Sequence, residues 1–346
     1  MTLLLVGSYK KFNTNEYVEL LADAYMKKGI QVIFEEQNFL YSNFIPHIIH
    51  IQWPESIYRW KNLIPMTNEG LEIFENKLKW YKGKCTKLVY TVHNLQPHDV
   101  ANEFDHSAYT IFLKYADIIV HHGNESIELI KRKYPETITS NHIIAPHGSY
   151  PIKKLPEIEQ VKDKYDLPKN KIIFTNFGLQ RSYKGIDFTL NVFKQLLNKN
   201  ICYFTVGALI NGAQPFEISQ DELCHRQIYK SIPPNEITDI IASTDVFFLG
   251  HSSGLNSGLI HLAISYNKPV IFPNIGNFEE QAKGFNFYEM YEVGNIESAQ
   301  QAINRMLVKL NHCENNLPDN KLWLNKNAWN IHIDRILKEI QKLLNI

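Results

Sequence analysis

Two cations follow an apolar run in the second half of the chain. The run occupies residues 171–177, Gly178 comes directly after it, and Arg181 and Lys184 precede Gly185, where a helical pattern begins. At the end of a strand, arginine can form paired hydrogen bonds with phosphate oxygens, and lysine adds a point charge. The loop is therefore suited to a phosphate or a diphosphate, although a loop that is merely solvated is the alternative interpretation.

A second stretch, 254–273, reads GLNSGLIHLAISYNKPVIFP and could bind the same group. Asn256 or Ser257 is suited to cap an apolar helix, and Gly258 would let a ligand approach the backbone. Unpaired amides at the start of a helix attract anions, so Ser257, Gly258 and Leu259 are candidates for contact with phosphate. An ordinary helix start is the alternative. If both stretches face one cleft, they contact a diphosphate from two sides and stabilise it as a leaving group.

Polar residues also follow two apolar runs in the first half, in HIQWPE (50–55) and YTVHNLQPHD (90–99). His93 and Asn94 come directly after a strand-like run, so we expect their side chains to reach a ligand cleft at the strand ends. A neutral imidazole at position 93 could hydrogen-bond a ligand or stabilise departing charge. A strand-end histidine with structural partners is the alternative.

Three further side chains of these motifs suit a ligand that carries hydroxyl groups. Asp99 or Glu55 could take the proton of a hydroxyl, and Trp53 could stack on a sugar ring. The alternatives are a helix cap at Asp99 and a partly buried tryptophan at position 53.

Short apolar runs alternate with helical patterns along the chain, which is typical of parallel sheets with crossover helices. Three prolines in 146–160 interrupt this alternation, and we place a domain boundary there. The sequence predicts an α/β protein with doubly wound domains at 1–150 and 151–324, which face a cleft, and a helix in 325–346 whose apolar stripe packs back on the first domain. The expected strands are 3–7, 30–34, 47–51, 87–92, 117–120, 142–145, 171–177, 202–206, 245–250 and 269–273, and the expected helices of the first half lie near 15–28, 67–83, 104–115 and 124–133.

Composition narrows the class of protein. With 346 residues, of which 44% are hydrophobic, the chain can form two cores. A formal net charge of zero gives no support for a nucleic-acid partner, and four scattered cysteines suit a reducing compartment.

The start, MTLLLVGSYKKF, is expected to be a first strand and not a signal peptide, and no apolar window is long enough to span a bilayer, so we expect a cytoplasmic protein. The histidines at 47, 50, 121 and 122 lack supporting ligand spacing, so we expect neither a metal nor a cofactor.

A basic, aromatic stretch occupies the first domain at 59–61, at 77–84 (KLKWYKGK) and at Lys87. Such a face can contact anionic lipid headgroups. A solvated amphipathic helix explains the same pattern.

The order of these motifs resembles GT-B glycosyltransferases, which consist of two Rossmann-like domains. The second half of the chain is similar to the donor half of the large retaining family that includes sucrose synthase and bacterial mannosyltransferases. The shared order is a strand, G-x-x-R-x-x-K-G and a helix, followed by a strand, a small-residue loop, a helix and KPVIFP. HIQWPE and TVHNLQPHD resemble motifs of a bacterial subset of that family. Together the motifs cover most of the chain in the same order.

The resemblance implies that the first domain binds the acceptor and the second binds a nucleoside diphosphate sugar, without a metal. Arg181 and Lys184 would bind the diphosphate, and the turn at Ser257 would contact phosphate and sugar. Gly178 and Ile232, the latter in the loop 231–236, would lie beside the donor sugar or nucleoside. In the first domain, the residues on the acceptor side would be Trp53, Glu55 and Asn94, with His93 and Asp99 as the catalytic candidates.

The chain departs from the resembled family at one point. Many relatives carry two glutamates separated by seven residues around this helix, whereas this chain has Gly254 and Leu262 there. Asn256, His261 and Glu279 are the candidates to hold the donor sugar or nucleoside instead. Retention of configuration is the default of the resembled family, and without the glutamate pair it is left open.

The sequence thus predicts a hexosyltransferase that moves a sugar from a nucleoside diphosphate sugar to a hydroxyl of a glycan or glycolipid. Synthesis of a bacterial surface polysaccharide at the inner face of the membrane is the expected setting. A sugar-nucleotide epimerase of the same architecture and a non-catalytic partner protein are the alternatives, because fold alone does not establish a reaction.

Overall fold

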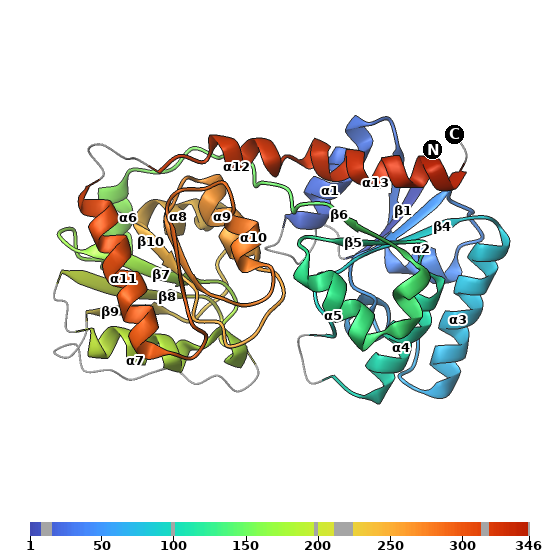
Figure 1. Ribbon diagram of the computed structural model, residues 1–346, viewed down its shortest axis with the longest axis horizontal. Helices are drawn as coiled ribbons and strands as arrows, with labels where there is room; N and C mark the ends of the chain where they lie inside the picture. The colour runs from blue at the N-terminus through green and yellow to red at the C-terminus, as the bar shows by residue number, and fades with distance from the viewer. Residues whose placement is uncertain (8–15, 98–100, 197–199, 211–223, 313–317, 345–346) are drawn as a thin grey trace. The chain divides into compact units, whose positions relative to one another are not determined.

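The computed structural model describes residues 1–7, 16–97, 101–196, 200–210, 224–312 and 318–344. The chain forms two compact units: unit 1 comprises Met1–Gly148 and Asn327–Ile346, and unit 2 comprises Ser149–Lys326 (Figure 1). The chain leaves unit 1 after Gly148 and returns to it at Asn327. The C-terminal helix therefore belongs to the same unit as the first strand.

Unit 1 is built on a six-stranded parallel sheet with the order β2-β1-β3-β4-β5-β6. Its central strands are apolar runs that are buried along their whole length, as expected when helices cover both faces of a parallel sheet. The strands are β1 Thr2–Val6, β2 Gln31–Phe34, β3 Ile48–Ile51, β4 Lys87–Thr91, β5 Ile118–His121 and β6 Asn141–Ile144; the helices are α1 Tyr17–Lys27, α2 Glu36–Tyr41, α3 Asn68–Gly83, α4 Glu103–Tyr115, α5 Glu125–Lys133 and α13 Trp329–Leu344, with short helical turns η1 Ser56–Trp60 and η2 Pro135–Thr139.

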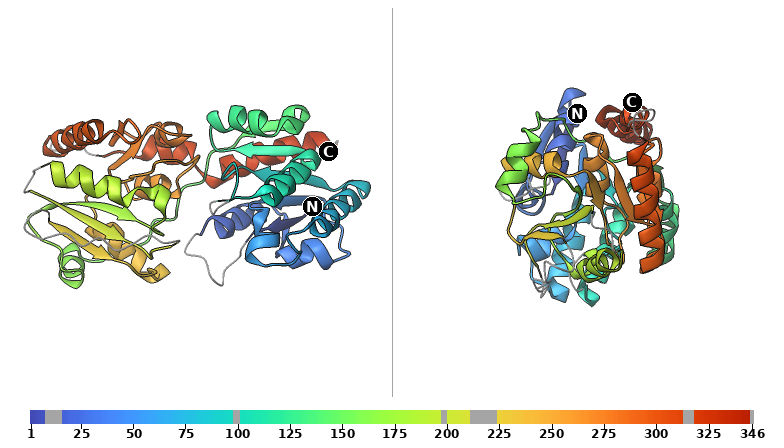
Figure 2. Two further views of the ribbon diagram at one scale, coloured as in Figure 1. Left: turned by 90° about the horizontal axis from the view of Figure 1, so that it is seen from below. Right: turned by 90° about the vertical axis from the view of Figure 1, so that its left-hand side faces the viewer.

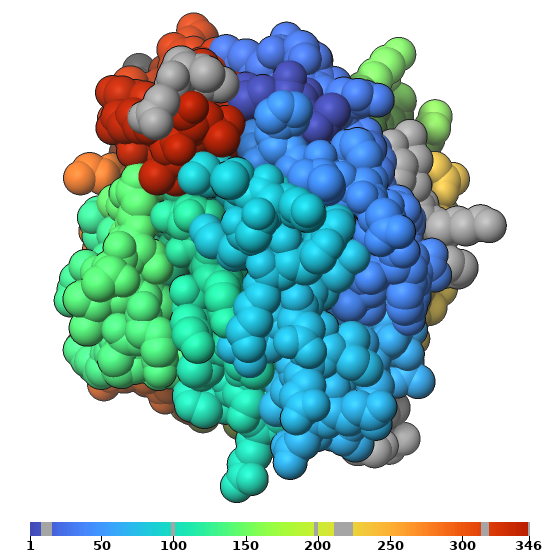
Figure 3. Space-filling view, turned by 90° about the vertical axis from the view of Figure 1, so that its right-hand side faces the viewer, coloured from blue at the N-terminus to red at the C-terminus, as the bar shows by residue number. Residues whose placement is uncertain are grey.

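The C-terminal helix α13 completes one face of unit 1. Its apolar stripe, which includes Ile333, Ile336 and Ile340, joins the core formed by α1 and the strands, and α13 contacts α1, β5 and β6. In Figure 3 the red surface of this helix adjoins the blue surface of the N-terminal part of the same unit. A Cβ atom on Gly148 would lie 2.1 Å from the ring of Trp329, so a side chain there would displace the first turn of α13.

Unit 2 contains a second six-stranded parallel sheet, with the order β12-β11-β10-β7-β8-β9. Figures 1 and 2 show helices on both faces of each sheet. The strands are β7 Ile172–Phe177, β8 Ile201–Val206, β9 His225–Ile228, β10 Val246–Phe248, β11 Val270–Pro273 and β12 Tyr288–Tyr291; the helices are α6 Ile158–Lys164, α7 Ile186–Gln195, α8 Ile237–Ser243, α9 Gly258–Ser265, α10 Phe278–Ala282, α11 Ile296–Asn311 and α12 Lys321–Lys326, with turns η3 Ser182–Lys184 and η4 Pro234–Glu236.

Alternate residues of β8 separate the two cores of unit 2. Ile201 and Tyr203 pack with α7 and α11 on one face of the sheet, whereas Cys202 and Phe204 pack with α6 and α8 on the other. This alternation is a consequence of the two-residue period of a strand. Helices therefore pack on both faces of the sheet and hold the strand ends in place. Loops that follow these strands start from a rigid edge, which suits a ligand site.

The predicted α/β architecture with two doubly wound sheets is confirmed. Each strand predicted in the first half corresponds to a strand of unit 1, with ends that differ by at most one residue. The prediction missed β9, β12 and α2. The strands β9 and β12 are short edge strands that contain charged or polar residues, and helix α2 has only six residues. None of the three is long enough to show the hydrophobic period of a strand or a helix in the sequence.

Removing part of the α13 core should destabilise unit 1. Ile336 is fully buried, so Ile336→Ala is expected to lower the free energy of unfolding by roughly 2–5 kcal/mol through lost burial and a residual cavity. Lys338→Ala, on the exposed face of the same helix, is the control. Urea unfolding of both variants measures the difference, and equal stability of the two would contradict the packing of α13 described above.

Candidate functional site

The side chain of Lys184 lies over the end of β7. Gly178, the first residue after the strand, has a φ of +112°, and a Cβ atom on it would lie 2.9 Å from Lys184 Nζ. The missing side chain thus leaves the space that the ammonium group uses. This is a physical reason for glycine at position 178, in addition to its backbone conformation.

The turn after β7 is fastened to the end of β8. The side-chain amide of Gln180, which is fully buried, donates to the carbonyls of Gly178 at 2.9 Å and of Val206 at 3.1 Å. Gly207 has a φ of +140°, and a Cβ atom there would lie 1.9 Å from the carbonyl oxygen of Gly178. Close approach of the two backbones therefore fixes the turn that carries Lys184.

Lys184 is a partly buried cation without an opposite charge. Burial, and to a lesser extent the neighbouring charge of Arg181, lowers the pKa of Lys184 to about 8. Within the described residues, no carboxylate or other acceptor pairs with this ammonium group. Such an arrangement is unfavourable by itself and becomes favourable when an anion arrives.

The loop after β10 is attached to the same turn. A Cβ atom on Gly250 would lie 2.0 Å from Thr189 Oγ1 and 2.9 Å from the carbonyl oxygen of Lys184. Two residues later, the amide of Ser252 donates to the carbonyl of Tyr183 at 2.8 Å. The loop that leads from β10 to α9 is therefore held against the turn that carries Lys184.

Helix α9 begins with amides that are open to a ligand. Ser257 is its N-cap residue, but the Ser257 side chain makes no capping hydrogen bond. Gly258 is exposed and Leu259 is partly buried, and in the described part of the chain no acceptor pairs with their amides. A Cβ atom on Gly258 would lie 3.2 Å from the hydroxyl of Tyr150. Backbone donors at the positive end of a helix suit an anion.

A glutamine that the sequence analysis missed lies at the same helix start. Gln281, in α10, accepts a hydrogen bond from the amide of Ser257 at 3.1 Å through its side-chain oxygen. The side chain comes from 24 residues further along the chain, and no local pattern marks it as a capping group. The sequence instead predicts Glu279 near the donor, and that residue is exposed in the first turn of α10.

The other residues predicted near the donor lie in different surroundings. Asn256 accepts a hydrogen bond from the side-chain amide of Asn277 at 3.0 Å, beside the start of α9. His261 is buried on α9, with its ring centroid 5.3 Å from that of Trp323. Ile232 is buried in the core with α6 and α8. The structure therefore favours packing roles for His261 and Ile232, and places Asn256 beside the helix start.

In unit 1, His93 lies in an aromatic cluster at the carboxyl edge of the sheet. Trp53 stacks on the imidazole, with ring centroids 4.3 Å apart, and Tyr17 meets it edge-on at 4.7 Å. His93 Nε2 lies 3.0 Å from Gln52 Oε1, within hydrogen-bond distance. Asn94 follows and is partly buried. Trp53 and His93 thus lie in contact at the ends of β3 and β4, and Asn94 is the next residue of the chain; Asp99 lies outside the described residues.

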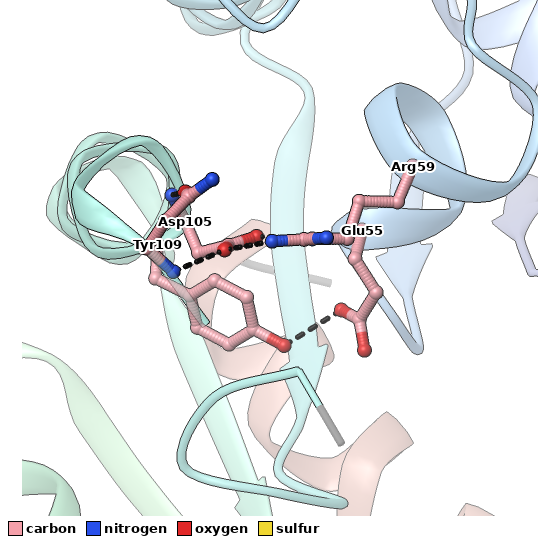
Figure 4. A network of polar contacts seen from close by, with 5 residues as sticks. Glu55, Arg59, Asp105 and Tyr109 are labelled. Carbon is pink, nitrogen blue, oxygen red and sulfur yellow. Dashed lines mark hydrogen bonds and ion pairs between the residues drawn. The ribbon is translucent and has the colours of Figure 1, made fainter. Parts of the chain in front are cut away.

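Glu55 belongs to a buried polar network between η1 and α4 (Figure 4). The hydroxyl of Tyr109 donates to Glu55 Oε2 at 2.6 Å. Beside it, Arg59 forms a two-pronged ion pair with Asp105, with a distance of 2.7 Å from Nε to Oδ1. Asp105 also accepts a hydrogen bond from the amide of Asn102 and so begins α4 with a capping box. The network fixes η1 against α4 and holds the carboxyl of Glu55 in place.

Burial raises the pKa of Glu55 to about 7, although the hydrogen bond from Tyr109 opposes the shift. The side chain is 1% exposed, and Oε1 has no hydrogen-bond partner within the described residues. A carboxyl group with this pKa exchanges its proton near neutral pH, which is what a general base needs. Because Glu55 is shielded from solvent, only a group in direct contact with its carboxyl could transfer a proton to it.

The basic stretch predicted in unit 1 is partly neutralised. The guanidinium of Arg59 is engaged by Asp105, and Lys82 Nζ lies 2.6 Å from Asp117 Oδ1. Lys77 donates to a backbone carbonyl of the loop after α2. These cations hold the unit together, and their charge is not wholly available to an anionic surface. In the described part of the chain, no helix combines the length and the apolar character needed to cross a bilayer.

No protein-family model matches the chain. The GDP-mannose:glycolipid 4-beta-D-mannosyltransferase of Xanthomonas campestris pv. campestris is 22% identical over 315 residues, which cover 86% of this chain and 81% of that protein. Sucrose-phosphate synthase from Thermosynechococcus elongatus matches with a TM-score of 0.63 and 12% identity, over 99% of this chain and 94% of that chain. HepE of Anabaena, in complex with UDP-glucose, matches with a TM-score of 0.62 and 13% identity, over 100% of this chain and 98% of that chain. The chain has the GT-B fold.

Glu55→Gln should remove a pH dependence of stability. Because the folded protein raises this pKa from 4.5 to about 7, it holds the proton more tightly than the unfolded chain does. The free energy of unfolding should therefore fall as the pH rises between these values, by roughly 3 kcal/mol, in the wild type and not in the variant. Urea unfolding from pH 4 to pH 8 measures the slopes, with Glu72→Gln on the exposed face of α3 as control. Identical slopes in all three proteins would contradict the burial of an ionisable Glu55.

Proposed function

We propose that the protein is a glycosyltransferase that moves a sugar from a nucleoside diphosphate sugar to a hydroxyl of a glycan or glycolipid. The observation that carries the proposal is the unpaired, partly buried ammonium of Lys184, in a turn that is fastened to the loop before α9. The fold and the mannosyltransferase relative support the same reaction class. The relative acts on a glycolipid, as its name states, which supports a glycolipid among the acceptors.

In the proposed reaction, unit 2 binds the donor. The bond between the anomeric carbon and the diphosphate oxygen breaks, and the diphosphate leaves with additional negative charge. Arg181 and Lys184 would receive this charge together with the amides of Gly258 and Leu259, in the way that preorganised donors stabilise a developing anion. We propose that these protein cations and amides serve the leaving group in place of a metal ion.

Unit 1 would hold the acceptor. Trp53 and Asn94 lie at the same edge as His93 and would position a sugar ring, while His93 would contact the reacting sugar. The acceptor hydroxyl loses a proton as its oxygen bonds to the anomeric carbon, and we propose Asp99 or Glu55 as the group that takes it, with His93 assisting. Glu55 is the one whose pKa and buried position the structure describes.

We further propose a peripheral contact between unit 1 and the cytoplasmic face of a bacterial membrane, where surface polysaccharides are made. Exposed apolar side chains gather around the end of α2 and η1: Tyr41 is 66% exposed, Phe44 37%, Ile45 46% and Trp60 48%. Helix α2 packs against η1, so these side chains belong to one region of the unit. Aromatic and aliphatic side chains of this kind, with Lys61 beside them, suit a lipid interface.

Lys184→Met should weaken the binding of nucleoside diphosphates. Loss of a charge-assisted hydrogen bond is expected to raise Kd for UDP or GDP, whichever the wild type prefers, by roughly 10- to 150-fold. Isothermal titration calorimetry with UDP, GDP and their hexose conjugates measures the change and identifies the base. Lys283→Met, at an exposed position of unit 2, is the matched control and should bind as the wild type does.

Two outcomes of that titration would contradict the proposal. If the wild type bound none of these nucleotides at millimolar concentration, the protein would be better described as a non-catalytic partner with the GT-B fold. If Lys184→Met and Lys283→Met bound equally well, the diphosphate would lie elsewhere.

A further inference from the structure

The first amide of the α9 start is held by another helix. The amide of Ser257 donates to the side-chain oxygen of Gln281, in α10, at 3.1 Å, whereas the side chain of Ser257 makes no capping hydrogen bond. A backbone amide can only donate, so the side-chain atom of Gln281 that faces it is the oxygen. The contact therefore fixes the orientation of the Gln281 amide group.

Contacts at both ends of α10 hold Gln281 in this place. The amide of Asn277 donates to the carbonyl of Leu255 at 2.9 Å, and its side chain donates to Asn256 Oδ1 at 3.0 Å. At the other end, the indole of Trp323 donates to the carbonyl of Gln281 at 2.6 Å. The side chain of Gln281 is buried, so α10 keeps it against the start of α9.

This arrangement leaves the next two amides of α9 to a ligand. A helix begins with amides that have no partner in a preceding turn, and a local N-cap side chain would accept from the second or third of them. In α9, Gln281 takes the amide of Ser257, and the amide of Ile260 donates to the carbonyl of Ser257 at 3.2 Å. In the described part of the chain, no acceptor pairs with the intervening amides of Gly258 and Leu259, and Gly258 is exposed.

The side-chain nitrogen of Gln281 has no partner within the described residues. Only the oxygen of this buried amide group is used. A glutamate has the same shape, and its carboxylate would accept the hydrogen bond from Ser257 more strongly at the positive end of a helix. An ionised carboxyl group would, however, repel an anion at the amides of Gly258 and Leu259. A neutral acceptor at position 281 therefore suits an anion site.

We propose that Gln281 is a positioning residue for the diphosphate. It holds the amide of Ser257, so that the amides of Gly258 and Leu259 face the ligand, and its neutral side chain leaves the positive end of α9 to the anion. The identity of that anion, a nucleoside diphosphate, rests on the proposed function. The competing explanation is that an ionised carboxyl group is costly to bury at position 281. That explanation predicts an effect of charge on stability and none on affinity.

Two substitutions separate the acceptor of Gln281 from its lack of charge. Gln281→Met removes the acceptor at nearly the same length, and it is expected to raise Kd for the preferred nucleoside diphosphate by roughly 2- to 10-fold. Gln281→Glu keeps the acceptor and adds a charge, and at pH 8 it is expected to raise Kd by roughly 10- to 100-fold. Isothermal titration calorimetry measures both changes. Gln160→Glu, exposed in the first turn of α6, is the matched control and should bind as the wild type does.

The pH dependence of binding distinguishes this role from a purely structural one. Protonation of the carboxyl group in Gln281→Glu removes the added charge, so the ratio of its Kd to that of the wild type should fall by about tenfold between pH 8 and pH 5. The same ratio should stay constant in Gln281→Met, which has no ionisable group at this position. Taking the ratio at each pH removes the pH dependence that the variant and the wild type share.

Two results would overturn the proposal. Equal binding of Gln281→Met and the wild type would mean that the contact with Ser257 positions nothing. A Kd ratio of Gln281→Glu that is the same at pH 5 and pH 8 would mean that charge at position 281 does not affect the ligand. If Gln281→Met fails to fold, the ratio measured for Gln281→Glu decides alone.

Titration of inorganic pyrophosphate separates the possible failures. If the wild type binds UDP or GDP and both Gln281 variants bind it equally well, the proposed transferase stands and the role of Gln281 falls. If the wild type binds pyrophosphate but neither nucleotide, and Gln281→Met binds pyrophosphate more weakly, the transferase falls and Gln281 still positions an anion site. If the wild type binds none of the three, both proposals are overturned.

Discussion

The uncompensated charge of Lys184 is the constraint on which the arrangement of unit 2 depends. Its ammonium group lies beside Arg181 and partly out of water, and this environment lowers its pKa from 10.5 to about 8. A flexible lysine would escape into solvent, so the surrounding backbone must hold it. Gly178 leaves room for the ammonium, and Gly250 lets the loop after β10 close on the turn from the other side. A charge held in this way is ready for an anion without further reorganisation.

The buried polar side chains have different partners in the two units. In unit 2 the polar side chains at the edge of the sheet mostly serve the backbone: Gln180 ties two turns together and Gln281 occupies one amide of α9. In the described part of unit 2, the groups that remain available to a ligand include the ammonium of Lys184 and the amides at the start of α9, which attract anions. In unit 1, within the described residues, the buried oxygens without hydrogen-bond partners include both of Glu36 and Oε1 of Glu55, and an aromatic cluster surrounds His93. The proposed function uses this difference, because the cations of unit 2 would receive a diphosphate and the sheet edge of unit 1 would receive an acceptor hydroxyl.

Local patterns were sufficient to predict the architecture and the cationic turn, because strand periods, glycine positions and charges are visible in short stretches of sequence. Long-range contacts were not visible. The helix of His261 is apolar on nearly every side, so its sequence could not show which face would meet Trp323, some sixty residues later. Arg59 was interpreted as part of a basic face, and its ion pair with Asp105 depends on how η1 packs against α4. Glu36 had no signal at all, since an unpaired buried carboxyl is recognisable only in three dimensions.

Hydrogen–deuterium exchange of the whole protein, with and without its preferred nucleoside diphosphate, tests whether Lys184 and the start of α9 bind the diphosphate. We expect slower exchange in two separate segments of unit 2, the turn 178–185 and the amides at 258–260, and no comparable change at 36–60 in unit 1. Protection that appears in both segments together would place the diphosphate between the cationic turn and the start of α9. Protection confined to other parts of the chain would contradict the account, because the diphosphate would then be bound without the lysine and the helix start around which the site is built.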